Sequence, residues 1–259
     1  MELPKKSVAY YIFNDDLQKE LDTYYNYGKD LSTRYYHKLR IINFKKLIDR
    51  IKFPQNAKIL DIGCGCGIYA ILLAESSFNT VGIDVSDEKI KMATIWSKDK
   101  KLVSIQFLKA DGERMPFKDN TFDFIVCSEV FEHLGNPFRG MQEFTRVLKR
   151  SGLGIISMPN LFSLEFFIKR ILNEVRHFCK NIDVDPHYKF SFIRIRDMLK
   201  SAGLLIKYNN SVGYLPIMGR MLNFVQDKRL LNLVTTFENW VSKKGFPFGA
   251  SYFVVVRKK

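Results

Sequence analysis

The amino-acid sequence predicts a doubly wound α/β fold, in which helices cover both faces of a mostly parallel sheet. Two observations support this prediction. Short apolar segments alternate with helical ones between residues 57 and 159, as is typical of βαβ units. A glycine-rich turn over residues 63–67 (GCGCG) also joins the first apolar segment to the first helical one. In folds of this class, ligands bind at the carboxyl ends of the strands.

A helical, aromatic segment is expected before this alternation, over residues 1–56. Seven of the twelve tyrosines fall before residue 37. Between Lys38 and Ile51, apolar side chains recur at helical spacing, and the pattern stops at Phe53-Pro54. These side chains are Leu39, Ile42, Leu47, Ile48 and Ile51. We therefore expect a helical cap, whose tyrosines at 24–36 either pack within it or contact a substrate.

The central segment predicts five strands, at residues 58–62, 80–84, 103–108, 122–127 and 153–158. A helix over residues 68–75 follows the first strand. The second helix is capped by Ser86 and carries acids in its first turn, where they favour the helix dipole. The third opens at Asn136-Pro137 and ends near Gly152. Its inward side chains are expected to be Phe138, Met141, Phe144 and Leu148.

The remaining chain predicts one more helix and two more strands. The helix runs from Ser191 to Ala202 and is stopped by Gly203, and the strands lie at 204–208 and 251–256. Two inserts, at about 160–186 and 210–248, interrupt the alternation. We expect the domain to span residues 57–259, with these inserts forming a lid over the substrate.

The net charge of +14 is unevenly distributed along the chain. Residues 1–56 hold 11 basic and 7 acidic side chains, residues 57–159 hold 13 of each, and residues 160–259 hold 17 and 7. The segregation indicates that the flanks face something anionic, such as nucleic acid, a membrane surface or a phosphorylated substrate.

Composition excludes several classes of protein. A chain with 46% hydrophobic residues, 15 Gly and 8 Pro is neither disordered nor collagen-like. Four cysteines without a Cys-x-x-Cys pair argue against a disulfide scaffold, and we expect no metal site, with Cys64 and Cys66 serving as small turn residues. The sequence shows no signal-type or membrane-spanning apolar run, so a cytoplasmic protein is expected, at most peripheral to a membrane.

The glycine-rich turn fits neither common phosphate-binding pattern. A dinucleotide fingerprint would need Gly or Ala where Ile68 stands, and it gains nothing from an acid such as Asp61 just before the turn. A P-loop is excluded because no Gly-Lys-Ser/Thr follows.

Three acids instead follow three consecutive strands. Asp61 ends the first, Asp84 the second and Asp111 the third. A carboxylate at the end of the second strand can accept hydrogen bonds from both hydroxyls of a ribose. An acid before the turn suits a cationic ligand group. The series describes a nucleoside site without a phosphate.

The chain resembles the class I S-adenosylmethionine-dependent methyltransferases, and within them the ubiquinone/menaquinone-biosynthesis-like (methyltransferase type 11) group. The resemblance covers residues 57–159 and, more loosely, residues 187–209. It rests on ILDIGCGCG, GIDVS, ADGERMPFKDNTFDFI, EVFEHL and EFTRVLKRSGLGIISMPN in this order. It implies S-adenosylmethionine as cofactor and a Rossmann-like sheet of seven strands whose last strand is antiparallel.

The resemblance also implies roles for single residues. Asp61 and the turn glycines would line the methionine end of the cofactor, these glycines being Gly63, Gly65 and Gly67. Asp84 would hold the ribose hydroxyls, with Val85 beside the adenine. Asp111, next to Gly112, would accept from the adenine amino group, and Ser128 would lie near the methionine moiety.

Two histidines are candidate acceptor-side residues. His133, just after the fourth strand, could act as a general base toward a hydroxyl, because histidine titrates near neutral pH. A purely structural role for His133 is equally consistent with the sequence. His187, before the Ser191 helix, is a weaker candidate of the same kind.

The sequence supports three hypotheses for function. The first is methyl transfer by in-line displacement to a small hydrophobic or lipid-linked acceptor, with peripheral membrane contact through residues 161–180, which are amphipathic and basic as a helix. Packing of that helix within the cap is the alternative. The second is methylation of tRNA or rRNA, suggested by the charge but lacking an appended RNA-binding module. The third is a non-catalytic cofactor-binding protein.

Overall fold

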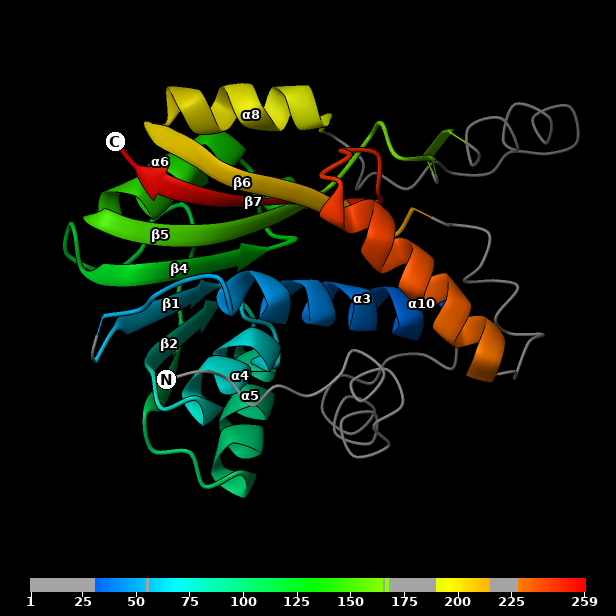
Figure 1. Ribbon diagram of the computed structural model, residues 1–259. Coiled ribbons are helices and arrows are strands. Elements are labelled where there is room, and N and C mark those ends of the chain that lie inside the picture. The colour runs from blue at the N-terminus through cyan, green and yellow to red at the C-terminus, as the bar shows by residue number, and fades with distance from the viewer. Residues whose placement is uncertain (1–30, 55, 165, 168–189, 215–227) are drawn as a thin grey trace, which may run out of the picture.

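Seven strands form a single sheet in the order β3-β2-β1-β4-β5-β7-β6. β7 is antiparallel to both β5 and β6, and the other neighbouring pairs are parallel. This arrangement confirms the predicted Rossmann-like α/β fold with an antiparallel last strand (Figure 1). The computed structural model describes residues 31–54, 56–164, 166–167, 190–214 and 228–259.

The strands are β1 (Lys58–Ile62), β2 (Asn79–Asp84), β3 (Ile105–Lys109), β4 (Phe122–Ser128), β5 (Leu148–Pro159), β6 (Leu204–Val212) and β7 (Ser251–Lys258). The helices are α3 (Leu31–Ile48), α4 (Ile68–Glu75), α5 (Asp87–Asp99), α6 (Pro137–Val147), α8 (Phe192–Ser201) and α10 (Lys228–Lys243), with the 3₁₀ turn η1 (Phe131–His133).

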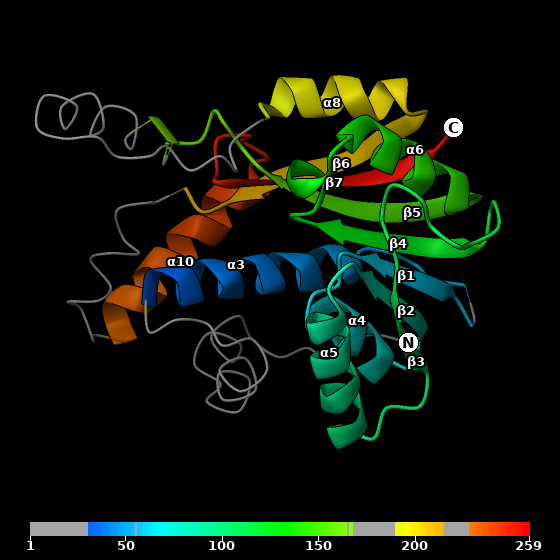
Figure 2. The same ribbon diagram turned by 180° about the vertical axis from the view of Figure 1, so that it is seen from behind.

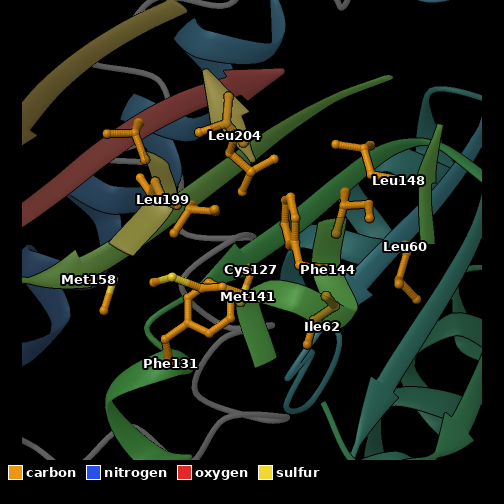
Figure 3. Close-up of a cluster of buried hydrophobic side chains, with 14 of the residues drawn as sticks. Leu60, Ile62, Cys127, Phe131, Met141, Phe144, Leu148, Met158, Leu199 and Leu204 are labelled. Carbon is orange, nitrogen blue, oxygen red and sulfur yellow. The ribbon is translucent and has the colours of Figure 1, made fainter. Parts of the chain in front are cut away.

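Alternate side chains of the central strands pack into two hydrophobic cores, one on each face of the sheet. On one face, α6 and α8 pack Met141, Phe144 and Leu199 over β1, β4 and β5 (Figures 2 and 3). On the other, α3 and α4 pack over the opposite side chains of these strands, including Phe124 of β4, and over Phe253 of β7. Both faces are therefore buried, which explains the nearly continuous apolar sequence of β4.

Three predictions for the central segment are wrong. α6 ends at Val147 instead of near Gly152, because Leu148 already pairs with Phe122 in the sheet. Phe138, expected to point inward, is 37% exposed. The third strand starts at Ile105, since Val103 is almost fully exposed.

The flanking boundaries also shift. α3 ends at Ile48, before Ile51, and β6 continues to Val212 instead of stopping at Tyr208. The second insert therefore starts after the sheet. Most of the first insert, including residues 168–180 of the amphipathic segment, lies outside the described residues. Across the part of the chain that the structure describes, no helix is long and apolar enough to cross a membrane.

Buried amide contacts join α3 to the far edge of the sheet. Asn43 on α3 and Asn210 on β6 exchange side-chain hydrogen bonds, at 2.6 and 3.2 Å. Asn210 also donates to the Ser242 hydroxyl on α10 at 3.0 Å. Burial of these polar groups requires such pairing. The contacts fix α3 and α10 at the same side of the sheet, which Figure 1 also shows.

The two phenylalanines of α6 provide a test of this packing. Phe144 is fully buried and Phe138 is exposed on the same helix. We expect Phe144→Ala to lower the free energy of unfolding by ~3–5 kcal/mol, because it leaves a cavity under β4 and β5. Phe138→Ala, the matched control, should lower it by only about 1 kcal/mol, because this side chain is already partly exposed. Urea denaturation of both variants measures the difference, and equal losses would contradict the packing described.

Candidate functional site

The glycine-rich turn lies where the strand order reverses. β1 has β2 on one side and β4 on the other, so the crevice at the carboxyl ends of β1 and β4 is the topological switch point at which such sheets bind ligands. Gly63 has φ +63°, and a Cβ there would come within 2.3 Å of Val130, which follows β4. Only glycine suits this position, because side chains rarely adopt positive φ and the neighbouring chain leaves no room.

Asp84 ties this turn to the next strand. One carboxylate oxygen accepts from the Gly65 N–H at 2.9 Å, and the other accepts from the Ser86 N–H at the same distance. A carboxylate offers about four lone-pair positions, so two remain for the ribose hydroxyls that the sequence predicts here. Val85, beside it, is 62% exposed, as a platform for a planar apolar group requires.

Asp61 is buried and faces the start of α4. Its carboxylate accepts from the Ala70 N–H at 3.1 Å. Burial raises the pKa of Asp61 to about 8, and the neighbouring Asp84 charge adds to the increase. A cationic ligand group nearby would stabilise the charged form. The acid would therefore fit the cationic methionine end of S-adenosylmethionine, while its hydrogen bond from Ala70 joins the end of β1 to α4.

The third acid lies on the surface. Asp111 is exposed, and its carboxylate accepts from the Glu113 N–H at 2.8 Å, which shapes the turn after β3. Gly112, next to it, is buried against Ile62. Ser128 ends β4, and its hydroxyl contacts the Ser157 hydroxyl at 2.8 Å and the Tyr69 hydroxyl at 3.3 Å.

An arginine clamp, formed by Arg146 and Glu143 of α6, holds the loop that starts at Asp111. All five N–H donors of Arg146 are used: two go to Glu143, two to the carbonyls of Met115 and Phe117, and one to Asp119. Glu143 in turn accepts from the Met115 N–H at 2.8 Å. The clamp fixes residues 111–119 beside the sheet. Sequence reasoning missed it, although the i, i+3 spacing of the two charges was a signal.

A second network of polar side chains, which sequence reasoning did not find, surrounds Glu129, directly after β4. One carboxylate oxygen accepts from the hydroxyls of Ser157 and Ser251, and the other lies 3.3 Å from an Arg40 guanidinium nitrogen. The partners come from β5, β7 and α3. Because these partners lie far from Glu129 in the sequence, no local sequence pattern indicates the network.

His133 and the cysteines are placed as follows. The His133 side chain is 53% exposed, with Nε2 3.9 Å from a carboxylate oxygen of Glu132. His187 lies outside the described residues. Cys64, Cys66 and Cys127 are free and buried. Among the described residues, no group of three or more His, Cys, Asp or Glu side chains is placed to hold a metal ion.

Known proteins with similar sequences include methyltransferases. Residues 60–156 match the family model of a methyltransferase domain. The chain is 31% identical over 139 residues to a ubiquinone biosynthesis O-methyltransferase of Rickettsia akari, covering 52% of this chain and 55% of that protein. It is also 31% identical over 165 residues to an uncharacterised protein of Methanocaldococcus jannaschii, covering 64% and 63%. The chain thus matches between half and two thirds of the length of these relatives.

Solved structures share the fold. An S-adenosylmethionine-dependent methyltransferase of Thermotoga maritima superposes with a TM-score of 0.60 at 19% identity, covering 97% of this chain and 99% of that one. A Pyrococcus horikoshii protein gives the same TM-score and identity, with coverage of 93% and 99%.

Removing the Asp84 carboxylate tests the cofactor site. We expect Asp84→Ala to weaken S-adenosylmethionine binding ~10- to 100-fold, because hydrogen bonds to a charged group contribute about 1.5–3 kcal/mol. Asp87→Ala is the matched control, since Asp87 is exposed at the start of α5 and pairs only with Lys109 among the contacts described. Isothermal titration calorimetry on both variants measures the dissociation constants. Unchanged binding by a folded Asp84→Ala protein would show that the site is elsewhere.

Proposed function

We propose that this chain, which belongs to the class I S-adenosylmethionine-dependent methyltransferase family and its ubiquinone/menaquinone-biosynthesis-like group, methylates a small hydrophobic or lipid-linked acceptor. The observation that carries the proposal is the Asp84 carboxylate, which binds the glycine-rich turn and the start of α5 at once. The remaining lone pairs of this carboxylate would accept hydrogen bonds from hydroxyl groups at the switch point of the sheet. The helical cap and the two inserts, residues 1–56, 160–186 and 210–248, are proposed to select the acceptor.

The chain's own residues would bind and orient the cofactor. Asp84 and Val85 would hold the nucleoside, Asp111 and Gly112 the adenine edge, and Asp61, the three turn glycines and Ser128 the methionine end. When bound, S-adenosylmethionine supplies an electrophilic methyl group on a sulfonium. Transfer is then an in-line displacement, in which the protein contributes mainly by aligning the nucleophile with the methyl carbon and excluding water.

Two observations favour a hydrophobic acceptor with a nucleophilic oxygen. Several relatives carry the name ubiquinone biosynthesis O-methyltransferase, at 31–33% identity. Exposed aromatic side chains also gather after β5 and before β7. Phe162 and Phe248 both pack against Phe192, and each is about half exposed. An apolar acceptor would cover them, whereas a phosphate groove would need polar and basic groups there.

RNA methylation is the second candidate, because residues 160–259 hold ten more basic than acidic side chains. Incubation with isotopically labelled S-adenosylmethionine and a fractionated cell extract separates the two. We expect label in the lipid or apolar small-molecule fraction. Label in RNA would establish the alternative, and transfer to no fraction by a protein that binds the cofactor would indicate a non-catalytic role.

Contact with an anionic membrane is proposed for residues 161–180. Apolar side chains alternate there with Lys169, Arg170, Arg176 and Lys180. We expect cosedimentation with vesicles containing phosphatidylglycerol to fall several-fold when Lys169 and Arg170 are changed to Glu, because each basic residue near such a surface contributes about 1 kcal/mol.

The matched control changes Lys58 and Arg150 to Glu. These exposed residues lie at the starts of β1 and β5, at the opposite end of the sheet from the insert. Equal pelleting of the two double variants would remove the membrane proposal and leave methyl transfer intact.

A further inference from the structure

The loop that follows β3 lies along helix α6. Every second residue between 113 and 119 hydrogen-bonds to that helix or to Asn136, its N-cap residue, and these four residues are Glu113, Met115, Phe117 and Asp119. The three residues between them are exposed. The loop is therefore an extended segment with one side fixed to α6 and the other side in solvent.

Glu113 joins the start of α6 to the acid that follows β3. Its carboxylate accepts from the Asn136 backbone N–H at 3.0 Å, and its own backbone N–H donates to Oδ1 of Asp111 at 2.8 Å. The N–H of an N-cap residue has no partner within its own helix, and a negative charge is favourable at a helix N-terminus. Glu113 meets both needs from a distant part of the chain. The direction of the Asp111 carboxylate thus depends on where α6 begins.

The arginine clamp holds the later part of the same loop. Nε and Nη2 of Arg146 donate to the two carboxylate oxygens of Glu143 at 2.7 and 2.8 Å, and the other N–H groups reach Met115, Phe117 and Asp119. The hydrogen bonds from Arg146 lower the pKa of Glu143, so both groups are charged at neutral pH. A lysine has three donors instead of a planar fork of five, so it could not make all these contacts.

Asp111 lies at the crevice and has acceptor capacity left. Gly112, next to it, is buried, and a Cβ there would lie 3.3 Å from Ile62, the last residue of β1. Asp111 itself is exposed, and among the hydrogen bonds of the described residues only Oδ1 of its carboxylate is engaged. A carboxylate has about four lone-pair positions. The acid can therefore bind a donor group of a ligand, in a direction that Glu113 sets.

We propose that Glu113 and Arg146 are positioning residues that give the cofactor site its preference for adenine over other purines, by directing the Asp111 carboxylate at the 6-amino group. The inference rests on the proposed function, which assigns Asp111 to the adenine edge. A carboxylate accepts from an amino group, whereas the carbonyl oxygen that other purines carry at this position has no proton to donate. Hydrogen bonds weaken steeply when they are misaligned, so the preference depends on how firmly the loop is held.

Binding of two purine ligands tests this inference. S-adenosylhomocysteine carries the 6-amino group, and S-inosylhomocysteine carries a carbonyl oxygen in its place. We expect wild-type protein to bind the first ~10- to 100-fold more tightly, the range that a hydrogen bond to a charged group gives, and Asp111→Ala to remove this preference. Glu113→Ala and Arg146→Met should each lower the preference at least ~3-fold, because the carboxylate is then poorly directed. Isothermal titration calorimetry measures both dissociation constants for each variant.

Three controls separate positioning from a general loss of stability. Glu113→Gln keeps a side-chain oxygen that can accept from Asn136, so it should retain the preference. Lys149→Met removes the ion pair with Asp123, which is about as exposed as the Arg146–Glu143 pair, and should also retain it. In the Asp111→Ala background, Glu113→Ala should cause no further change, because it acts through Asp111.

The outcomes distinguish this inference from the proposed function. Full preference in folded Glu113→Ala and Arg146→Met proteins, an equal loss in Lys149→Met, or a further change in the double variant would overturn the inference and leave methyl transfer intact. If Arg146→Met does not fold, the comparison of Glu113→Ala with Glu113→Gln decides. A wild-type protein that binds both ligands equally would also overturn the inference. A wild-type protein that binds neither ligand would contradict the proposed function itself.

Discussion

The Asp84 carboxylate is the interaction on which the geometry of the crevice depends. It links the N–H of Gly65, after β1, to the N–H of Ser86, which caps α5. These two loops are separated in sequence by a whole helix and strand, so nothing local would hold them in register. One side chain that accepts from both fixes the separation of the turn from the next strand end. Without a ligand, the site is therefore already shaped for one.

On each face of the sheet, one helix contributes both to the hydrophobic core and to the site. On one face, α6 contributes Phe144 to the core and Arg146 to the loop after Asp111, so packing and loop placement depend on the same helix. On the other, α3 contributes Phe44 to the core and Arg40 to the end of β4. Both sides of the crevice are thus built by helices that the core already orients, which keeps the charged groups in place at little additional entropic cost.

Sequence patterns predicted the parts of the fold that are local. α4 matches the predicted residues, and Ser86, Asn136 and Ser191 cap helices as expected, because capping and apolar periodicity depend on near neighbours. The end of α6 was missed, since only pairing with Phe122 shows that Leu148 belongs to the sheet. The acids at the strand ends were placed at one edge because parallel strands bring their carboxyl ends together. The Arg40–Glu129 and Glu129–Ser251 contacts were not predictable, since they join residues 89 and 122 positions apart in the chain.

The contacts of α3 change how the N-terminal segment relates to the chemistry. A cap in front of a domain could be replaced without altering the reaction, provided that it still covered the acceptor. Here the same helix packs Leu47 into the core, pairs Asn43 with β6 and places Arg40 against Glu129. The electrostatic environment at the end of β4 is consequently set by a helix that precedes every strand of the sheet. Acceptor binding and the charge balance at the end of β4 would then be coupled through α3, because a substrate that displaced this helix would also move the Arg40 guanidinium away from Glu129.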